Sequence, residues 1–402
     1  MIDKNIGKNC TGCTACRNIC PKNAITMRED REGFFYPVVE QEQCVSCGLC
    51  ISVCPVLHFY KKEAYQEPEV YAGWNLEDDI RISSTSGGVF TALAEAVMER
   101  GGYVAGAIYD EQFSICHIVT DQKEMIPLLR QSKYAQSALS TVYREIKGLL
   151  DRGEMVLFCG TPCQSAGLQQ YLKKDYEKSY FCDFICRGVI SQKVYHKFLD
   201  DTAKQKKSTL KTVQFKNKDF GWNQFSTKLS FENQSIYQKD RNQDSYMRGY
   251  LKHNLFIRPS CSNCKFKEIP RNSDLSLGDF WGISNYNKEL DNDRGTSVIL
   301  VNSRKGKELL GWSKDRLFLE QRSLDEVLLG NQCLLHSAPA GEFRAYFFDH
   351  MDHESFEQLL LKIDRKAQHL TWKDIIMNLR NGIKTLFKRR SSNHEQKRDG
   401  AF

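Results

Sequence analysis

The 402-residue sequence lacks any run of about 18 apolar residues, the length that marks a transmembrane helix. Its first residues, Met1 to Asn5, also lack the basic and then apolar blocks of a secretory signal peptide. Beyond one N-terminal repeat there is no further repeat, and no low-complexity segment occurs before the C-terminal tail. These absences predict a cytoplasmic protein.

An excess of one charge is also missing from the body of the chain. The formal charge is +7, but residues 362–402 hold 11 Lys and Arg against 4 Asp and Glu, so the remaining 361 residues are formally neutral. We therefore expect no nucleic-acid groove in the folded core and no nucleic-acid partner. The chain is 41% hydrophobic and 27% charged, typical of a soluble globular protein, and its length suggests two or three domains.

Cysteine, in contrast, is abundant, with 16 residues. A disulfide framework is disfavoured in a reducing compartment, so metal ligation is the better interpretation. Eight of the cysteines form two runs with the spacing C-x2-C-x2-C-x3-C followed by proline, the pattern of bacterial two-cluster ferredoxins. The first run is Cys10, Cys13, Cys16 and Cys20 before Pro21, and the second is Cys44, Cys47, Cys50 and Cys54 before Pro55.

This spacing predicts two 4Fe-4S clusters with interleaved ligands. Three thiolates on a tight loop can hold three corners of a cubane, while the fourth cysteine of each run reaches the neighbouring cluster. Two structural zinc knuckles are the alternative, but zinc usually takes two separated pairs of ligands rather than two complete repeats. We expect one cluster on Cys10, Cys13, Cys16 and Cys54, and the other on Cys44, Cys47, Cys50 and Cys20.

Two polar loops in the body are candidate anion sites. Residues 83–88 are rich in Ser and Gly and precede an apolar, helix-periodic stretch from Val89 that two glycines end at 101–102. Such a loop presents free backbone N–H groups to a phosphate, although it can equally be a simple N-cap. Residues 132–137 offer an ammonium, a phenol and an amide, or else form an ordinary solvated loop.

Two strand–loop–helix units carry further cysteines. A strand at 155–159 leads to Cys163 and a helix from Gln164, and a strand at 180–185 leads to Cys186 and a helix near Ser191. These units predict a mainly parallel α/β sheet with its site at the carboxyl ends of the strands. Residues 103–109 read as another strand, and residues 210–240 as a β-hairpin excursion.

Four of the body cysteines could hold a third metal site. Cys261 and Cys264 form a C-x2-C pair, for which ligation is the favoured interpretation. For Cys116 and Cys333 a buried, inert thiol is the better interpretation.

Taken together, these motifs resemble the beta subunit family of coenzyme F420-reducing hydrogenases and dehydrogenases, over roughly residues 1 to 330. The matching segments, in the family's order, are Ser84–Gly88, Ser132–Ser137, Gly160–Gln164, Cys186–Gly188, Cys261-x2-Cys264 and Gly278–Gly282. One departure is Arg187, where histidine is frequent in the family, and its charge could alter the potential of a nearby cluster.

The resemblance implies FAD and a third 4Fe-4S cluster. Carried over by motif, the cluster ligands are Cys163, Cys186, Cys261 and Cys264. The flavin-binding residues are Ser84, Ser86, Gly87, Gly88, Lys133, Tyr134, Gln136 and Ser137. We therefore expect an α/β (α+β) multidomain protein: a ferredoxin-like module at 1–60, a domain with the flavin loops at 61–150, a domain with the third cluster at 151–330 and a basic helical tail at 331–402.

Electron counting suggests the function. Each cluster passes one electron, whereas a deazaflavin or nicotinamide accepts a hydride, so a flavin must sit between them. We expect an oxidoreductase that links a redox partner protein, such as a ferredoxin or a reductase or hydrogenase subunit, to an organic hydride acceptor. That acceptor is coenzyme F420 or another substrate in hosts that lack it. A non-catalytic electron-relay subunit and a scaffold with structural clusters are the alternatives.

The tail carries a separate signal. Apolar residues between Trp372 and Phe387 recur at helical spacing, and six Lys and Arg lie on and beyond that stretch. Such a basic amphipathic segment at 371–390 can lie on an anionic membrane surface or dock on an acidic partner. Alternatively its apolar stripe packs on the body, followed by disordered residues 391–402.

Overall fold

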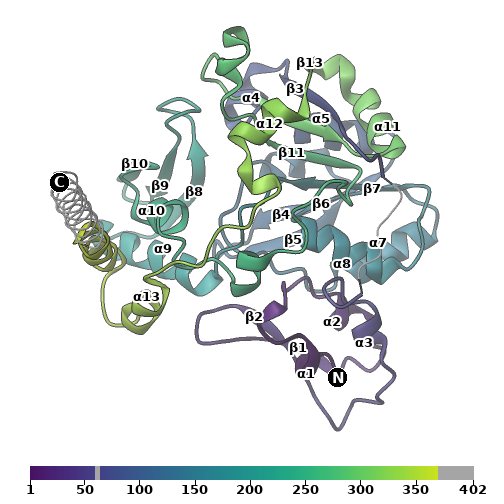
Figure 1. Cartoon of the computed structure of the whole chain (residues 1–402), viewed down its shortest axis with the longest axis horizontal. Coiled ribbons are helices and arrows are strands. Elements are labelled where there is room, and N and C mark those ends of the chain that lie inside the picture. The colour runs from purple at the N-terminus through teal and green to yellow at the C-terminus, as the bar shows by residue number, and fades with distance from the viewer. Residues whose placement is uncertain (59–63, 370–402) are drawn as a thin grey trace, which may run out of the picture. The chain divides into compact units, whose positions relative to one another are not determined.

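The computed structural model describes residues 1–58 and 64–369. The chain divides into two compact units, Met1–Arg344 and Ala345–Phe402, which are considered separately. Everything that bears on the cysteines lies in the first unit (Figure 1).

The N-terminal module is small and built around its cysteines. It contains α1 (Ile2–Ile6), a 3-10 turn (Gly7–Asn9), α2 (Ala15–Ile19), the antiparallel strands β1 (Ile25–Glu29) and β2 (Phe35–Val39), and α3 (Leu49–Ser52). Cysteines of the module share a buried cluster with Ile2, Ile6, Ile25 and Val39 or pack against it. The apolar core that forms around the loops keeps water away from the sulfur atoms.

The body is organised on one sheet of eight strands in the order β13-β3-β12-β11-β7-β6-β4-β5. Only the three pairings β11–β7, β7–β6 and β6–β4 are parallel, and the other four are antiparallel. The strands are β3 (Glu69–Asn75), β4 (Tyr103–Tyr109), β5 (Ile115–Thr120), β6 (Val156–Gly160), β7 (Ser179–Phe184), β11 (Leu275–Asp279), β12 (Ser297–Val301) and β13 (Leu317–Arg322).

The prediction of a mainly parallel sheet is therefore wrong, although the α/β class is confirmed. Parallel strands need a crossover, and here helices connect only part of the sheet. A tight turn at 110–114 folds β5 back on β4, with Phe113 at a positive φ of 59°. Short 3-10 turns rather than a crossover helix join β11 to β12.

Helices cover both faces of this sheet (Figure 1). On one face, α5 (Val89–Met98) and α11 (Arg304–Ser313) pack on Leu157, Leu275 and Ile299. On the other, α7 (Val142–Asp151) and α8 (Pro162–Leu172) pack on Val156, Phe158 and Phe181. This second layer also contains Cys13, Ala15 and Val53 of the N-terminal module, so α7 and α8 lie between the module and the sheet.

Several local predictions agree with the structure. The strand predicted at 103–109 is β4, and those predicted at 155–159 and 180–185 are β6 and β7 to within one residue. The helices start where the caps indicated: Thr161 forms a capping box with Gln164 before α8, and Ser191 caps α9 (Gln192–Lys206).

The excursion at 210–240 is larger than the predicted hairpin. It forms a three-stranded antiparallel sheet of β8 (Leu210–Asn217), β9 (Ser226–Phe231) and β10 (Ile236–Asp240), followed by α10 (Ser245–Leu251). The remaining short helices of the first unit are α4 (Asp78–Ser83), α6 (Ile126–Leu129) and α12 (Leu324–Gly330).

The second unit begins within α13 (Arg344–His350) and continues through helical residues 356–369. Phe347 makes edge contacts with Phe348 and Phe356 there. The predicted amphipathic segment 371–390 lies outside the described residues. In the parts of the chain that the structure describes, no helix combines the length and apolarity that crossing a membrane demands.

Candidate redox centre

The first predicted group of ligands is gathered in the interior of the N-terminal module. Cys10, Cys13, Cys16 and Cys54 are all buried, at 7–8% exposed. Burial raises the pKa of the Cys13 thiol to about 12, and the nearby Cys10 and Cys54 raise it further. Four thiolates can share such a place only when a positively charged partner such as iron is present.

Gly12 shows how tightly this loop is built. Its φ of 73° is in the left-handed region, and a Cβ there would stand 2.1 Å from the Gln136 side chain. Its N–H points to the Cys10 sulfur at 3.3 Å. Glycine is therefore the residue that lets this loop turn inside the packed interface.

The second predicted group surrounds a cavity of about 150 Å³ on the outer side of the module. All four members line it, namely Cys20, Cys44, Cys47 and Cys50. Cys47 is exposed, and the neighbouring Val45 is 57% exposed. This group is therefore the one closest to solvent.

The third predicted group, from four separate places in the body, surrounds a smaller cavity of about 30 Å³, which Cys163, Cys186, Cys261 and Cys264 all line. Cys163 lies in the first turn of α8, where the Thr161 hydroxyl is 3.2 Å from its sulfur. Cys186 follows β7, and the other two lie in and just after a 3-10 turn (Pro259–Asn263).

The chemistry of this group fits a cluster. Burial raises the pKa of the Cys186 thiol to about 12, while Lys267 and a hydrogen bond from the Gly188 N–H act in the opposite direction. The Lys267 ammonium donates to the carbonyl oxygens of Cys186 and Cys333 at 2.5 and 2.7 Å. Thiols, a nearby cation and backbone N–H donors are the surroundings that an anionic iron–sulfur cluster needs.

Within residues 1–58 and 64–369, no three Cys, His, Asp or Glu side chains come together closely enough to hold a single metal ion. The cysteines surround cavities instead. The assignment of each group to a cluster stays a prediction.

The two cysteines expected to be inert differ in place. Cys333 is half-buried and lies on the edge of the third cavity, 3.9 Å from the Arg187 guanidinium. Arg187 itself donates to Asn254 at 2.7 Å and to the Leu251 carbonyl at 2.9 Å, so this departure from the family pattern is held in place. Cys116 lies on β5.

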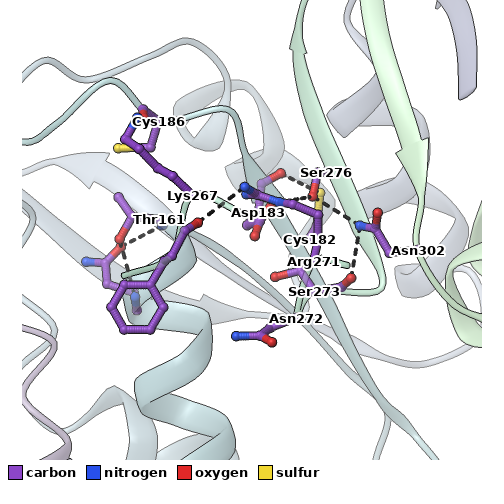
Figure 2. Close-up of polar contacts among 12 residues, drawn as sticks. Thr161, Cys182, Asp183, Cys186, Lys267, Arg271, Asn272, Ser273, Ser276 and Asn302 are labelled. Atoms are coloured by element: carbon purple, nitrogen blue, oxygen red, sulfur yellow. Dashed lines mark hydrogen bonds and ion pairs between the residues drawn. The ribbon is translucent and has the colours of Figure 1, made fainter. Parts of the chain in front are cut away.

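A buried ion pair anchors the third loop to the sheet (Figure 2). Arg271 donates to Asp183 at 2.9 Å, and the two side chains are only 2% and 1% exposed. Arg271 also donates to the Ser276 hydroxyl, which accepts from Asn302 as well. The loop after Cys264 is thus fixed to β7 and β11. Sequence reasoning missed this pair because nothing local marks it.

A cavity of about 630 Å³ opens beside the third group. Six of the eight predicted flavin residues line it, namely Ser84, Ser86, Gly88, Lys133, Tyr134 and Ser137. Cys186, Arg187 and Gly188 form part of its wall, so the cavity and the third group of cysteines share residues. The volume suits a cofactor-sized ligand.

The other two predicted flavin residues do not line the cavity. Gly87 is buried, where its N–H donates to the Ser297 hydroxyl and a Cβ would meet the Gly73 carbonyl at 2.4 Å. Gln136 points toward the N-terminal module, where it accepts from Arg258 at 2.7 Å. Both residues support the loops rather than face the cavity.

The polar lining of the cavity is held by internal hydrogen bonds. The Lys133 ammonium donates to the carbonyls of Leu128 and Arg130 at 2.7 and 2.6 Å, and burial lowers its pKa to about 7. His117 is bonded to the Ser137 hydroxyl at 2.8 Å and to the Cys159 carbonyl at 3.1 Å. Burial lowers the pKa of His117 to about 4, so the ring is neutral at pH 7.

Another part of the cavity wall was missed at the level of sequence. Lys216 at the end of β8 is only 5% exposed and is paired with Asp279. Trp222 donates to Asp279 at 2.8 Å and stacks on Trp281 with ring centroids 4.7 Å apart. The Gly278–Gly282 motif gave a signal for this wall, but nothing marked Lys216, because it comes from the presumed hairpin.

Arginines hold the N-terminal module against the body. Arg258 is fully buried and donates to the carbonyls of Cys10 at 2.6 Å and Phe35 at 2.8 Å. Its guanidinium also lies 4.5 Å from the Tyr36 ring. Arg144 on α7 donates to the Asn18 and Cys20 carbonyls at 2.7 and 3.1 Å. The relative placement of the cysteine groups therefore rests on specific buried contacts.

Comparison with known families agrees with this geometry. Residues 9–57 match the 4Fe-4S dicluster domain, and residues 153–327 match the C terminus of the coenzyme F420 hydrogenase/dehydrogenase beta subunit. The chain joins a 4Fe-4S dicluster domain to an F420 hydrogenase/dehydrogenase beta subunit domain. The resemblance inferred from the motifs is confirmed, and the module is an iron–sulfur electron-transfer domain.

Curated relatives match either part of the chain. A component of the F(420)H(2) dehydrogenase of Methanosarcina mazei is 23% identical over 165 residues, 39% of this chain and 46% of the relative. A component of the Na(+)-translocating ferredoxin:NAD(+) oxidoreductase complex of Acetobacterium woodii is 41% identical over 46 residues, 11% of this chain and 13% of the relative. The chain thus spans less than half the length of these relatives.

A solved structure is also similar to the chain. It is the xenon-derivatised F420-reducing [NiFe] hydrogenase complex from Methanosarcina barkeri, of which one chain matches with a TM-score of 0.47 and 17% identity. The match covers 71% of this chain and 90% of that chain.

Proposed function

We propose that the chain is an iron–sulfur flavoprotein oxidoreductase. In this proposal it links a redox partner protein, at the dicluster module, to an organic hydride acceptor in the 630 Å³ cavity. The observation that carries the proposal is the shared wall: Cys186 lines both the third cysteine cavity and the large cavity.

The order of the cysteine groups supports a route for electrons. The group at Cys47 is the one nearest solvent, where a partner protein can approach. The buried group around Cys10 lies in one apolar cluster with Cys163 and Cys264 of the third group. Solvent, outer group, inner group, third group and cavity therefore follow one another without a break.

The cavity residues support a flavin. The loop at 84–88 precedes α5, whose N-terminus favours a phosphate, and Lys133 and Tyr134 line the same space. When bound, the clusters would carry single electrons and FAD would convert them to the pair that a hydride contains. The chain itself supplies the thiolate ligands, a neutral His117, and the Trp281 and Lys216 wall that shields the acceptor from water.

The acceptor is proposed to be coenzyme F420 or a related hydride acceptor, since the relative from Methanosarcina mazei is named as part of an F(420)H(2) dehydrogenase. Its name and that of the Acetobacterium woodii relative describe components of larger enzymes, which favours a second candidate: a relay protein that only passes electrons within a larger complex. Contact of residues 371–390 with a membrane surface stays a prediction from sequence alone.

The test is flavin content together with reoxidation by the isolated chain. The protein is purified anaerobically, reconstituted with iron, sulfide and FAD, and reduced with dithionite. Under the oxidoreductase proposal it holds FAD, and added F420 or NAD(P)⁺ reoxidises it at a rate above the buffer control. A fully metallated chain that takes up no FAD and transfers electrons only to a protein partner would establish the relay role instead.

A further inference from the structure

Two cysteines outside the predicted ligand groups lie side by side in the floor of the large cavity. Cys159 on β6 and Cys182 on β7 are direct partners in the register of these parallel strands. Partners in a parallel pair point to the same face of the sheet, and both residues belong to the same apolar cluster. Cys159 lines the cavity, whereas Cys182 is 0% exposed.

The separation suits a disulfide. Neighbouring strands are about 4.8 Å apart, inside the range of about 4.4–6.8 Å between the Cα atoms of bonded cysteines. The two thiols are close enough to hydrogen-bond with each other, and both are free. Figure 2 shows Cys182 next to Asp183 and Ser276, in the buried ion-pair network that fixes this end of β7.

Neither cysteine belongs to the third ligand group. The small cavity is lined by Cys163, Cys186, Cys261 and Cys264, with Cys333 at its edge, and neither Cys159 nor Cys182 lines it. The predicted cluster ligation therefore leaves both thiols available for other chemistry.

We propose that Cys159 and Cys182 form a redox-active dithiol/disulfide pair that exchanges with a small organic disulfide in the cavity. The Cys159 thiolate attacks one sulfur of that disulfide, which forms a mixed disulfide and releases one thiol. The Cys182 thiol then loses its proton and attacks the Cys159 sulfur, which forms the Cys159–Cys182 bond and releases the second thiol. The protein loses two electrons and two protons, and the organic disulfide gains them.

Position assigns these roles. Cys159 is the sulfur that a molecule in the cavity can reach, and the positive charge of Lys133 on the cavity wall attracts its thiolate. Cys182 is shielded from everything except Cys159, which is the situation of a resolving cysteine. A bond across two adjacent strands is short for the β-sheet geometry, so it should be readily reduced.

The experiment uses the metallated, flavin-reconstituted full chain under argon. It is equilibrated in mixtures of 2-mercaptoethanol and 2-hydroxyethyl disulfide, quenched with acid and alkylated. Trypsin leaves Cys159 with Cys163 in one peptide and Cys182 with Cys186 in another. Fragment spectra that cut between the two cysteines of each peptide are therefore needed to assign the sulfur atoms.

The expected result is a Cys159–Cys182 disulfide that grows with the oxidised fraction of the buffer, disappears with dithiothreitol and leaves the iron content unchanged. C159S removes it, with Cys182 recovered as a free thiol, whereas C116S leaves it unchanged. Both cysteines recovered as alkylated thiols in the most oxidising buffer would overturn the proposal, as would a disulfide confined to the ligand cysteines.

Iron and FAD are measured in the same samples. This inference does not require the flavoprotein function, so the two can fail separately. A chain without FAD that still forms the bond contradicts only the flavoprotein proposal. A chain with full iron and FAD that never forms it contradicts only the dithiol proposal.

Discussion

The dicluster module and the cavity of the body are both built around cysteines, but they encode their sites in opposite ways. The module places eight cysteines within 45 residues, from Cys10 to Cys54, and the spacing alone identifies the groups. The body brings Cys163, Cys186, Cys261 and Cys264 together from segments up to about 100 residues apart. A local site is written in the sequence, whereas an assembled site depends on the sheet that carries it.

The largest expected effect separates the two sites by their iron. Cys264→Ala should remove the third cluster, about four of roughly twelve iron atoms, and leave the module intact, because their ligands come from different loops. Iron and sulfide analysis after anaerobic purification measures this loss. Cys116→Ala is the matched control and should retain all the iron. A Cys264→Ala protein with an unchanged iron content would mean that the body ligands are assigned wrongly.

The next effect concerns the contact between the two regions. Arg258→Ala should destabilise the chain by about 3–5 kcal/mol, because it removes a buried cation and leaves the Cys10 and Phe35 carbonyls without their donor. Chemical denaturation of the anaerobic holoprotein measures this change. Arg28→Ala removes an exposed arginine paired with Glu40 and should cost at most about 1 kcal/mol. Equal effects of the two substitutions would contradict the role of Arg258 at the interface.

A pH effect should be confined to the body. His117 has a lowered pKa of about 4, so its contribution is fully present above its unfolded pKa of about 6.5 and is lost as the pH falls toward 4. Between pH 7 and pH 5 the wild-type chain should lose about 2 kcal/mol more stability than His117→Gln. Denaturation at both pH values measures this difference. Parallel losses in the two proteins would show that His117 titrates normally.

A comparable or smaller effect concerns the flavin. Lys133→Ala should weaken FAD binding by about 1–3 kcal/mol, because the ammonium lines the cavity and also ties the 128–131 backbone together. Fluorescence titration of the apo-flavin, iron-loaded protein gives the affinity. The control Lys123→Ala changes an exposed lysine paired with Glu99 and should leave FAD affinity unaltered. Unchanged affinity in Lys133→Ala would exclude Lys133 from the flavin site.

How much could be predicted from the sequence follows the same division. The module's cysteine groups, β4, and the starts of α8 and α9 were readable because each depends on local spacing or on a local cap. The direction of the strands was not, since a pattern of alternation does not reveal whether β12 and β13 return antiparallel to β3.

Long-range partners escaped for a related reason. Arg258, Arg271 and Lys216 are each buried against residues far away in the chain, and in the sequence they look like ordinary surface cations. Gln136 was identified by motif, yet its partner turned out to be Arg258 at the module interface rather than the cavity. Motifs identify the loops, and only the fold decides which way each side chain points.

The most direct test of the account is the cofactor content of the anaerobically purified and reconstituted chain. The account predicts about twelve iron atoms and one FAD per chain, with the FAD lost in variants of the cavity loops but retained in the Cys116→Ala control. A chain that stays at about eight iron atoms and binds no FAD after reconstitution would contradict it.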